Sequence, residues 1–397
     1  MRQLSLLIGT LVLLFFFNAG TTAELSGHVG LEARYFAHAP LFAEQKHHNA
    51  SINIEPEIAH QWDDGRQSLV FTPFARLDNV DTKRSHFDIR ELLWTKAADE
   101  WELQVGIGKV FWGVTESQHL VDIINQTDFV ENTDGEDKLG QPMVNLTWIK
   151  DWGTLNFFVL PSFRERTFPG NKGRLRPSIP VDHAHAIYQS SQKERHIDWA
   201  ARWFHSIGDW DIGLSHFSGT SRDPQFQPSE DSQHLQAVYH QISQTGLDVQ
   251  AIIGDWLVKL ELISRQLPGK QYTAFTTGFE YTLVGIFQSD ADLGVIAEYS
   301  FDDRGNKNPF RSAFQNDLMA GMRLVLNDIQ SSEILFGGIF DLDDEAVLYT
   351  LEGSRRLGEA WKLTVETRIF SNITKTTDPL YSLRSDDHLL INLAWFF

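Results

Sequence analysis

Two segments of opposite charge carry most of the side chains that can bind an ion or a polar solute. In the first, Gly113 to Pro142, the single base Lys138 is outnumbered by seven acids: Glu116, Asp122, Asp128, Glu131, Asp134, Glu136 and Asp137. In the second, Phe163 to Arg176, the single acid Glu165 is outnumbered by five bases: Arg164, Arg166, Lys172, Arg174 and Arg176. Opposite charges facing across a narrow, low-dielectric passage focus the field and orient dipolar solutes. We therefore expect the two segments to form two sides of a constriction. On an open surface they would instead bind divalent cations and lipopolysaccharide phosphates.

The first segment also contains side chains that favour burial. Between His119 and Asn125, the residues Leu120, Val121, Ile123 and Ile124 are apolar. Apolar side chains of this size are most often found inside a protein. The constriction is therefore the favoured interpretation for Gly113 to Pro142, with an exterior loop as the alternative.

An enzymatic interpretation depends on His216 and Ser218, which lie two residues apart and so share one face of a strand. This pair resembles the base and nucleophile of outer-membrane phospholipases, in which a histidine activates a serine. Gly219 stands where that family has an asparagine. Acidic clusters such as Asp341 to Glu345 lie in short loops, which seldom hold the several oxygens that a hard cation needs. We predict no enzyme, metal or cofactor, and keep lipid hydrolysis as a remote alternative.

These side chains must be positioned by β-strands, because the hydropathy alternates with period two. From His388 to Phe397, one face carries Leu389, Ile391, Leu393, Trp395 and Phe397. An apolar outer face and an aromatic last residue are typical of the final strand of an outer-membrane barrel. The same period recurs along the chain, so the fold class is all-β, a single transmembrane antiparallel β-barrel. A secreted β-sandwich is the alternative.

The alternation assigns a set of charged residues to the inside of the barrel. Charges are costly toward lipid and tolerated toward water, so their placement indicates a wet lumen. The predicted lumen-lining residues are Arg76, Arg90, Glu102, Arg202, Lys259, Glu261, Glu298, Arg323, Glu366 and Arg368. Charges of both signs can also pair across the lumen and only brace the wall, an alternative of equal weight.

Composition and the N-terminus are consistent with this class. Arg2 precedes an apolar run and small residues ending at Ala23, which predicts a signal peptide over residues 1–23 and a barrel over 24–397. The chain has no cysteine and a formal charge of −19, which exclude thiolate chemistry and argue against nucleic-acid binding. Its mean hydropathy of −0.26 excludes a helical membrane protein.

Turn residues set the number of strands. Short links such as Asp63 to Arg66 alternate with long ones such as Thr220 to Ser243, as expected for short periplasmic turns and long extracellular loops. Alternation requires Gln233 to Ile242 to belong to a loop. We then count 18 strands, with 16 as the runner-up, and a barrel of this size encloses an aqueous lumen.

Several motifs resemble those of an uncharacterised family of Gram-negative outer-membrane barrels, a porin-related domain of unknown function. The motifs are Gly108–Gly113, Val121–Asp128, Lys138–Pro142, Leu160–Arg166, Trp256–Glu261 and Phe279–Thr282. The resemblance covers about Gly106 to Phe397. It implies an outer-membrane location and a barrel fold, and it supplies no substrate.

These observations together predict a passive channel in the outer membrane of a Gram-negative bacterium. Its expected partners are membrane lipid and lipopolysaccharide, small polar solutes, and the barrel-assembly machinery, which would recognise the strand ending at Phe397. Export of lipids or hydrophobic molecules is the alternative function.

Overall fold

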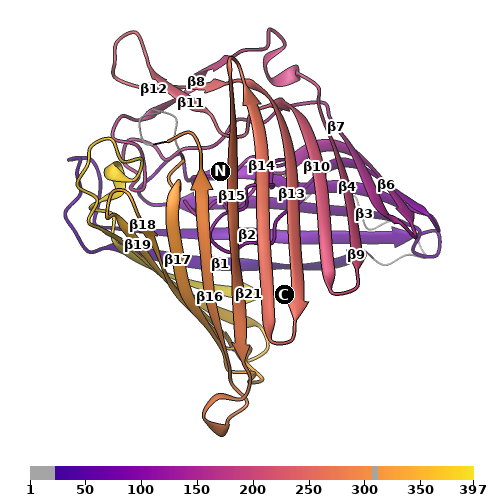
Figure 1. The fold of residues 1–397 in the computed structure, drawn as a ribbon. Helices are drawn as coiled ribbons and strands as arrows, with labels where there is room; N and C mark the ends of the chain where they lie inside the picture. Colours follow the sequence, from indigo (N-terminus) through magenta and orange to yellow (C-terminus); the bar gives the residue numbers. More distant parts are fainter. Residues whose placement is uncertain (1–22, 306–311) are drawn as a thin grey trace.

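The computed structural model describes residues 23–305 and 312–397, which form a closed antiparallel β-barrel (Figure 1). The predicted signal peptide lies outside the described residues except for Ala23. Closure comes from the pairing of β1 (Glu24–Phe36) with β21 (His388–Phe396), in which His28 is opposite Phe396 and Phe36 is opposite His388. None of the helical turns in the described ranges has the length and apolarity to cross a membrane.

The barrel has 18 strands, which confirms the predicted number and makes the runner-up of 16 wrong. Between β1 and β21 the strands are β2 (His48–Trp62), β3 (Gln67–Asp78), β4 (His86–Ala97), β5 (Trp101–Gly108), β6 (Gln141–Lys150), β7 (Gly153–Leu160), β9 (Asp198–Ile207), β10 (Trp210–Thr220), β13 (Gln241–Ile253), β14 (Trp256–Leu267), β15 (Lys270–Leu283), β16 (Asp292–Asp302), β17 (Asn316–Val325), β18 (Glu333–Asp341), β19 (Val347–Leu357) and β20 (Trp361–Ser371).

A second, three-stranded sheet lies beyond one end of the barrel (Figure 1). It consists of β8 (Val181–Tyr188), β11 (Gln225–Pro228) and β12 (Leu235–Tyr239). Because β12 pairs with β8 and not with the barrel, the expected placement of Gln233 to Ile242 in a loop is confirmed for β12, while Gln241 and Ile242 begin β13. We call this end, which also carries the connection between β5 and β6, the long-loop end.

Aromatic side chains mark the opposite end, which we call the short-turn end. Tryptophans at strand termini there include Trp101, Trp148, Trp210, Trp256 and Trp361, and all five are exposed. Exposed apolar residues continue along the outside of the strands, for example Leu389 and Ile391 of β21. Indole rings favour the boundary between water and lipid, so this band is suited to a bilayer interface.

The largest apolar core lies inside the barrel. It joins Trp112, Val121, Ile123 and Ile124 of the β5–β6 connection to wall residues Phe158, Leu160, Phe217, Ile263 and Ala274. Val121 and Ile124 are fully buried. The apolar stretch of the acidic segment therefore packs on one inner wall, and this contact places its charged residues within the lumen.

Candidate functional site: a charged loop inside the barrel

Residues 109–140 connect β5 to β6 and run through the lumen, and we call them the inner loop. Two wall carboxylates bind its first half. Glu261 on β14 accepts the backbone N–H groups of Val114 (2.7 Å), Thr115 (3.1 Å) and Val121 (3.1 Å). It also accepts the Thr115 hydroxyl at 2.8 Å. A buried carboxylate with several donors is a strong anchor, because each charge-assisted bond is stronger than a neutral one.

Glu298 on β16 makes the second anchor. Its carboxylate accepts the N–H of Glu116 at 2.7 Å, and both the N–H and the hydroxyl of Ser117 at 2.8 and 2.7 Å. Both glutamates are at most 1% exposed. The alternation had assigned both to the lumen, and the structure shows that they bind backbone groups that would otherwise be buried without partners.

Wall arginines bind the acids of the inner loop. The pairs are Arg323 with Glu116 at 2.7 Å, Arg90 with Asp128 at 2.7 Å, Arg76 with Glu131 at 2.6 Å, and Arg368 with Asp134 at 2.7 Å. These arginines lie on β17, β4, β3 and β20, so they approach the loop from different sides of the barrel. The charges of wall and loop are therefore largely paired with each other.

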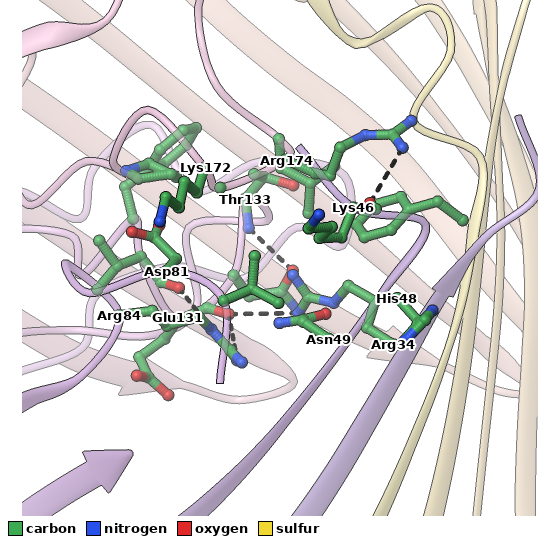
Figure 2. Close-up of a pocket in the computed structure, with 18 residues that line it drawn as sticks. Arg34, Lys46, His48, Asn49, Asp81, Arg84, Glu131, Thr133, Lys172 and Arg174 are labelled. Carbon is green, nitrogen blue, oxygen red and sulfur yellow. Dashed lines mark hydrogen bonds between the residues drawn. The ribbon is translucent and has the colours of Figure 1, made fainter. Parts of the chain in front are cut away.

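The pair of Arg76 and Glu131 belongs to a larger buried network. Glu32 on β1 accepts Arg76 at 3.0 Å and Arg84 at 2.9 Å, and Arg34 lies 3.7 Å away. Figure 2 shows Arg34 and Arg84 converging on Glu131, whose carbonyl oxygen accepts Arg84 at 3.3 Å. The same alternation that revealed Arg76 would have revealed Glu32 and Arg34. No periodic signal identifies Arg84, which lies in a loop.

The remaining acids of the inner loop have other surroundings. Asp122 pairs with Lys138 at 2.9 Å, Glu136 pairs with His119 at 2.9 Å, and the Asp137 side chain is exposed. Burial disfavours the charged form of His119, but the carboxylates of Glu136 and Glu261 outweigh that effect and raise its pKa to about 10. His119 is therefore a cation at neutral pH. Burial opposes the charge of Asp128 as well, but His86 and Arg90 hold the pKa of Asp128 below its ordinary value.

Among the described residues, the bases of the basic segment form no ion pairs with the acids of the inner loop, although Arg176 lines the same cavity as Glu116 and Asp134. Arg164 pairs with Asp88 on β4 at 2.6 Å, Arg166 with Asp223 at 2.8 Å, and Arg174 with Asp386 at 2.5 Å. Arg176 donates to the carbonyls of Pro177 and Ser178 at 2.7 and 3.0 Å. Arg164, Arg166 and Arg174 thus pair with acids of the wall and of neighbouring loops. Two of them also bind the inner loop: Arg164 donates to the carbonyl of Gly140 at 2.8 Å, and Arg166 donates to the side chain of Gln126 at 3.3 Å. Lys172 is exposed and lines the small cavity in Figure 2 together with Arg174.

Other predicted lumen residues pair within the wall or lie beside the loop. Arg202 binds Asp248 with two contacts of 2.7 Å, and Lys259 lies 4.0 Å from Glu280. Glu366 accepts Asn132 of the inner loop at 3.2 Å. Glu102 is half-buried on the same face of β5 as Gln104.

Two connected cavities remain open around the inner loop. One, of about 700 Å³, lies between the loop and β17 to β20. The other, of about 650 Å³, reaches the long-loop end, and the two share residues such as Ser117, Asp134 and Phe314. The inner loop therefore divides the lumen, and the space beside it is large enough to hold many water molecules.

The two residues of the phospholipase-like pair share the outer face of β10, as predicted. His216 contacts Thr245 at 2.9 Å and Ser243 at 3.4 Å, both on β13. Both ring nitrogens therefore contact the neighbouring strand, so the described contacts do not support a catalytic dyad of His216 and Ser218.

Two groups of described residues have the composition of a metal site: His86, Asp128 and Glu131 inside the barrel, and Asp341, Asp344 and Asp378 at the long-loop end. The ligand atoms of His86, Asp128 and Glu131 all lie within 4.8 Å of one another. Arg90 and Arg76 already neutralise the two carboxylates, at 2.7 and 2.6 Å. A cation would compete with these guanidinium groups, so the first group has the arrangement of an ion-pair network.

Comparisons with known proteins support the fold. No family model matches the chain, and no curated protein does. Among solved structures, Pseudomonas aeruginosa OccK11 (OpdR) is similar with a TM-score of 0.53 and 11% identity, over 95% of this chain and 96% of that one. A Rh. blastica porin variant has a TM-score of 0.46 at 9% identity, over 95% of this chain and 100% of that one. Vibrio cholerae OmpT has a TM-score of 0.45 at 9% identity, over 95% of this chain and 100% of that one. The similarity to OccK11 (OpdR) supports the antiparallel β-barrel fold of this chain.

Proposed function

We propose that this protein is an outer-membrane channel for the passive diffusion of small polar or charged solutes, narrowed by residues 113–142. The observation that carries the proposal is the attachment of the inner loop to strands around the barrel. Glu261 and Glu298 bind its backbone, while Arg323 and Arg368 bind its acids. A loop held this way cannot be an exterior hairpin, and the space beside it is the path that solutes would use.

The pattern of charges suits a channel better than a packed core. Wall and loop carry both signs, and the pairs are arranged around open cavities. Ions in a low-dielectric interior are costly unless they are paired or hydrated. Water in the remaining space would hydrate the exposed edges of these pairs and supply the medium for diffusion.

The proposed location is the outer membrane of a Gram-negative bacterium. The apolar outer surface and the tryptophan band would contact membrane lipid, with lipopolysaccharide around the long-loop end. Phe397 closes the C-terminal strand by exchanging two backbone hydrogen bonds with Gly27, each of 3.1 Å. We propose this strand as the one that the barrel-assembly machinery would recognise.

Conductance in planar bilayers tests the proposal. Folded protein should form open channels, and the double variant Glu261→Gln and Glu298→Gln should raise the conductance because it weakens both loop anchors. Glu102→Gln is the matched control, since it removes one lumen charge without touching these anchors. Deleting Asp122 to Asp137 should also raise the conductance. If the double variant and the deletion both conduct as the parent does, the inner loop does not limit the path.

The two alternatives predict other results. An exporter of lipids or hydrophobic molecules would give no ion conductance from folded protein. A lipid hydrolase would cleave phospholipid in the presence of calcium and lose that activity in Ser218→Ala. The observed contacts of His216 with β13 do not favour the second alternative.

A further inference from the structure

The wall opposite the inner loop carries an apolar row in place of the expected polar one. Across four adjacent strands, Met319, Ile339, Leu348 and Phe370 are directly paired in register. All four line the cavity of about 700 Å³. A lumen wall that served only hydrated ions would favour polar side chains at these positions. This row, the apolar row, is therefore a feature that simple ion diffusion does not explain.

Part of the apolar row supports the loops above it. Phe370 and Leu348 pack with Leu383 and Leu380 of the β20–β21 connection. Ile339 is only half-buried, and the next positions toward the short-turn end are Gly321 and Gly337, which add no side chain. The side chain of Met319 packs over both glycines, with its methyl carbon 3.3 and 3.5 Å from where their Cβ atoms would lie, so Met319 and Ile339 together present an apolar surface to the cavity.

A negatively charged zone follows the glycines. Arg323 lies 2.7 Å from Glu116, 3.6 Å from Glu280 and 2.9 Å from Glu333. Arg368 is shared in the same way by Asp134, at 2.7 Å, and Glu366, at 3.9 Å. Two guanidinium groups, together with Lys259 at 4.0 Å from Glu280, thus face five carboxylates, so the zone carries excess negative charge. Arg176 and His119 are further cations that line the same cavity.

Glu352 adds a sixth carboxylate to this zone. It is directly opposite Glu366 in the pairing of β19 with β20, and it lines the cavity. No ion pair of Glu352 occurs among residues 23–305 and 312–397. Like charges directly opposite each other on adjacent strands are unfavourable. A cation from solution would relieve this repulsion.

We infer that the cavity binds amphipathic cations, in which an ammonium group is attached to an aliphatic or aromatic body. The body would lie against Ile339 and Met319, and the ammonium group would reach Glu352. This inference rests on the proposed channel function and narrows its solute class. One row of lumen residues separates the two features along β17 to β20, namely Gly321, Gly337, Thr350 and Arg368.

Block of the open channel by n-alkylammonium ions, from methyl to hexyl, tests the inference. Each added CH₂ group that is buried should strengthen the block roughly three- to fourfold. The n-alkylsulfonates of equal length should block much less, because they carry the opposite charge. Equal block by the two series, or block that does not change with chain length, would overturn the inference while leaving the channel in place.

Two variants assign the effect to the residues. Ile339→Ser should remove much of the gain from methyl to hexyl, and Glu352→Gln should weaken block by every member of the series about two- to fivefold. Leu318→Ser, on the lipid-facing side of β17, and Glu102→Gln are the matched controls. Heat-dependent gel mobility shows whether each variant is folded, and Leu348→Thr replaces Ile339→Ser if that variant fails to fold.

A second readout separates this inference from the proposed function. Binding of hexylammonium to the protein in lipid nanodiscs, corrected for empty nanodiscs, requires no conduction. Binding that Glu352→Gln weakens would support the inference even if no current flows, in which case only the channel proposal fails. If hexylammonium binds no more tightly than methylammonium, the inference is overturned.

Discussion

Glu261 binds Thr115 twice, accepting its backbone N–H at 3.1 Å and its hydroxyl at 2.8 Å. The carboxylate is fully buried on β14, and the threonine lies in the limb of the inner loop that Glu261 and Glu298 hold against the wall. Replacing Glu261 with Ala should destabilise this limb by about 1.5–3 kcal/mol for each charged hydrogen bond that water does not replace. Hydrogen exchange should become faster at residues 114–121. Glu359→Ala, in the exposed turn between β19 and β20, is the control, and unchanged protection in Glu261→Ala would show that the anchor contributes little.

Arg76 is the second residue whose loss should be costly. Its guanidinium binds Glu32 at 3.0 Å and Glu131 at 2.6 Å, and all three side chains are nearly inaccessible to solvent. Arg76→Met would leave two buried carboxylates short of a cation, at a cost of about 3–5 kcal/mol. Equilibrium unfolding by denaturant would measure this loss in the free energy of unfolding. A double-mutant cycle with Glu131→Gln should give a large coupling energy, and additive effects would contradict a direct pair.

His119 should make the inner loop sensitive to alkaline pH. Burial opposes its charge, but Glu136 and Glu261 raise its pKa to about 10, above the ordinary value of 6.5. A group whose pKa is raised in the folded state stabilises that state, here the attachment of the inner loop to the wall. This stabilisation is complete below about pH 6.5 and is lost as the pH rises through about 10. Conductance should therefore increase between these pH values. His119→Gln should remove this step, whereas His205→Gln, on β9, should keep it.

Gly140 is where the inner loop returns to the wall. A Cβ atom there would lie 2.4 Å from the carbonyl oxygen of Arg90 and 2.6 Å from that of Ile89. Both are backbone atoms of β4 and cannot move aside as a side chain can, so Gly140→Ala should cost about 1–3 kcal/mol. Gly353→Ala on β19, where the nearest atom would be 3.8 Å away, should be nearly neutral in the same unfolding measurement. Equal effects of the two variants would show that Gly140 is not closely packed.

Local periodicity in the sequence determines the strands of this protein and the direction of their side chains. The alternation from His388 to Phe397 corresponds to β21, and the same rule assigned Glu261, Glu298, Arg323 and Arg368 to the lumen. This works because successive side chains of a strand point to opposite faces, so a residue's side follows from its neighbours alone. The charge bias of Gly113 to Pro142 and its apolar stretch follow from local composition, which also needs no knowledge of the fold.

Which charges pair is a property of the closed barrel only. Arg368 and Asp134 are 234 residues apart in sequence, and Arg323 and Glu116 are 207 apart, yet each pair is separated by 2.7 Å. The basic segment has the composition of a partner for the acidic one, but Arg174 binds Asp386 because the closed barrel brings their loops together. The apolar row of Met319, Ile339, Leu348 and Phe370 likewise appears only once four strands are in register. Pairing and register depend on contacts between distant segments, and tertiary structure alone decides them, since one strand's pattern does not specify its position along the next.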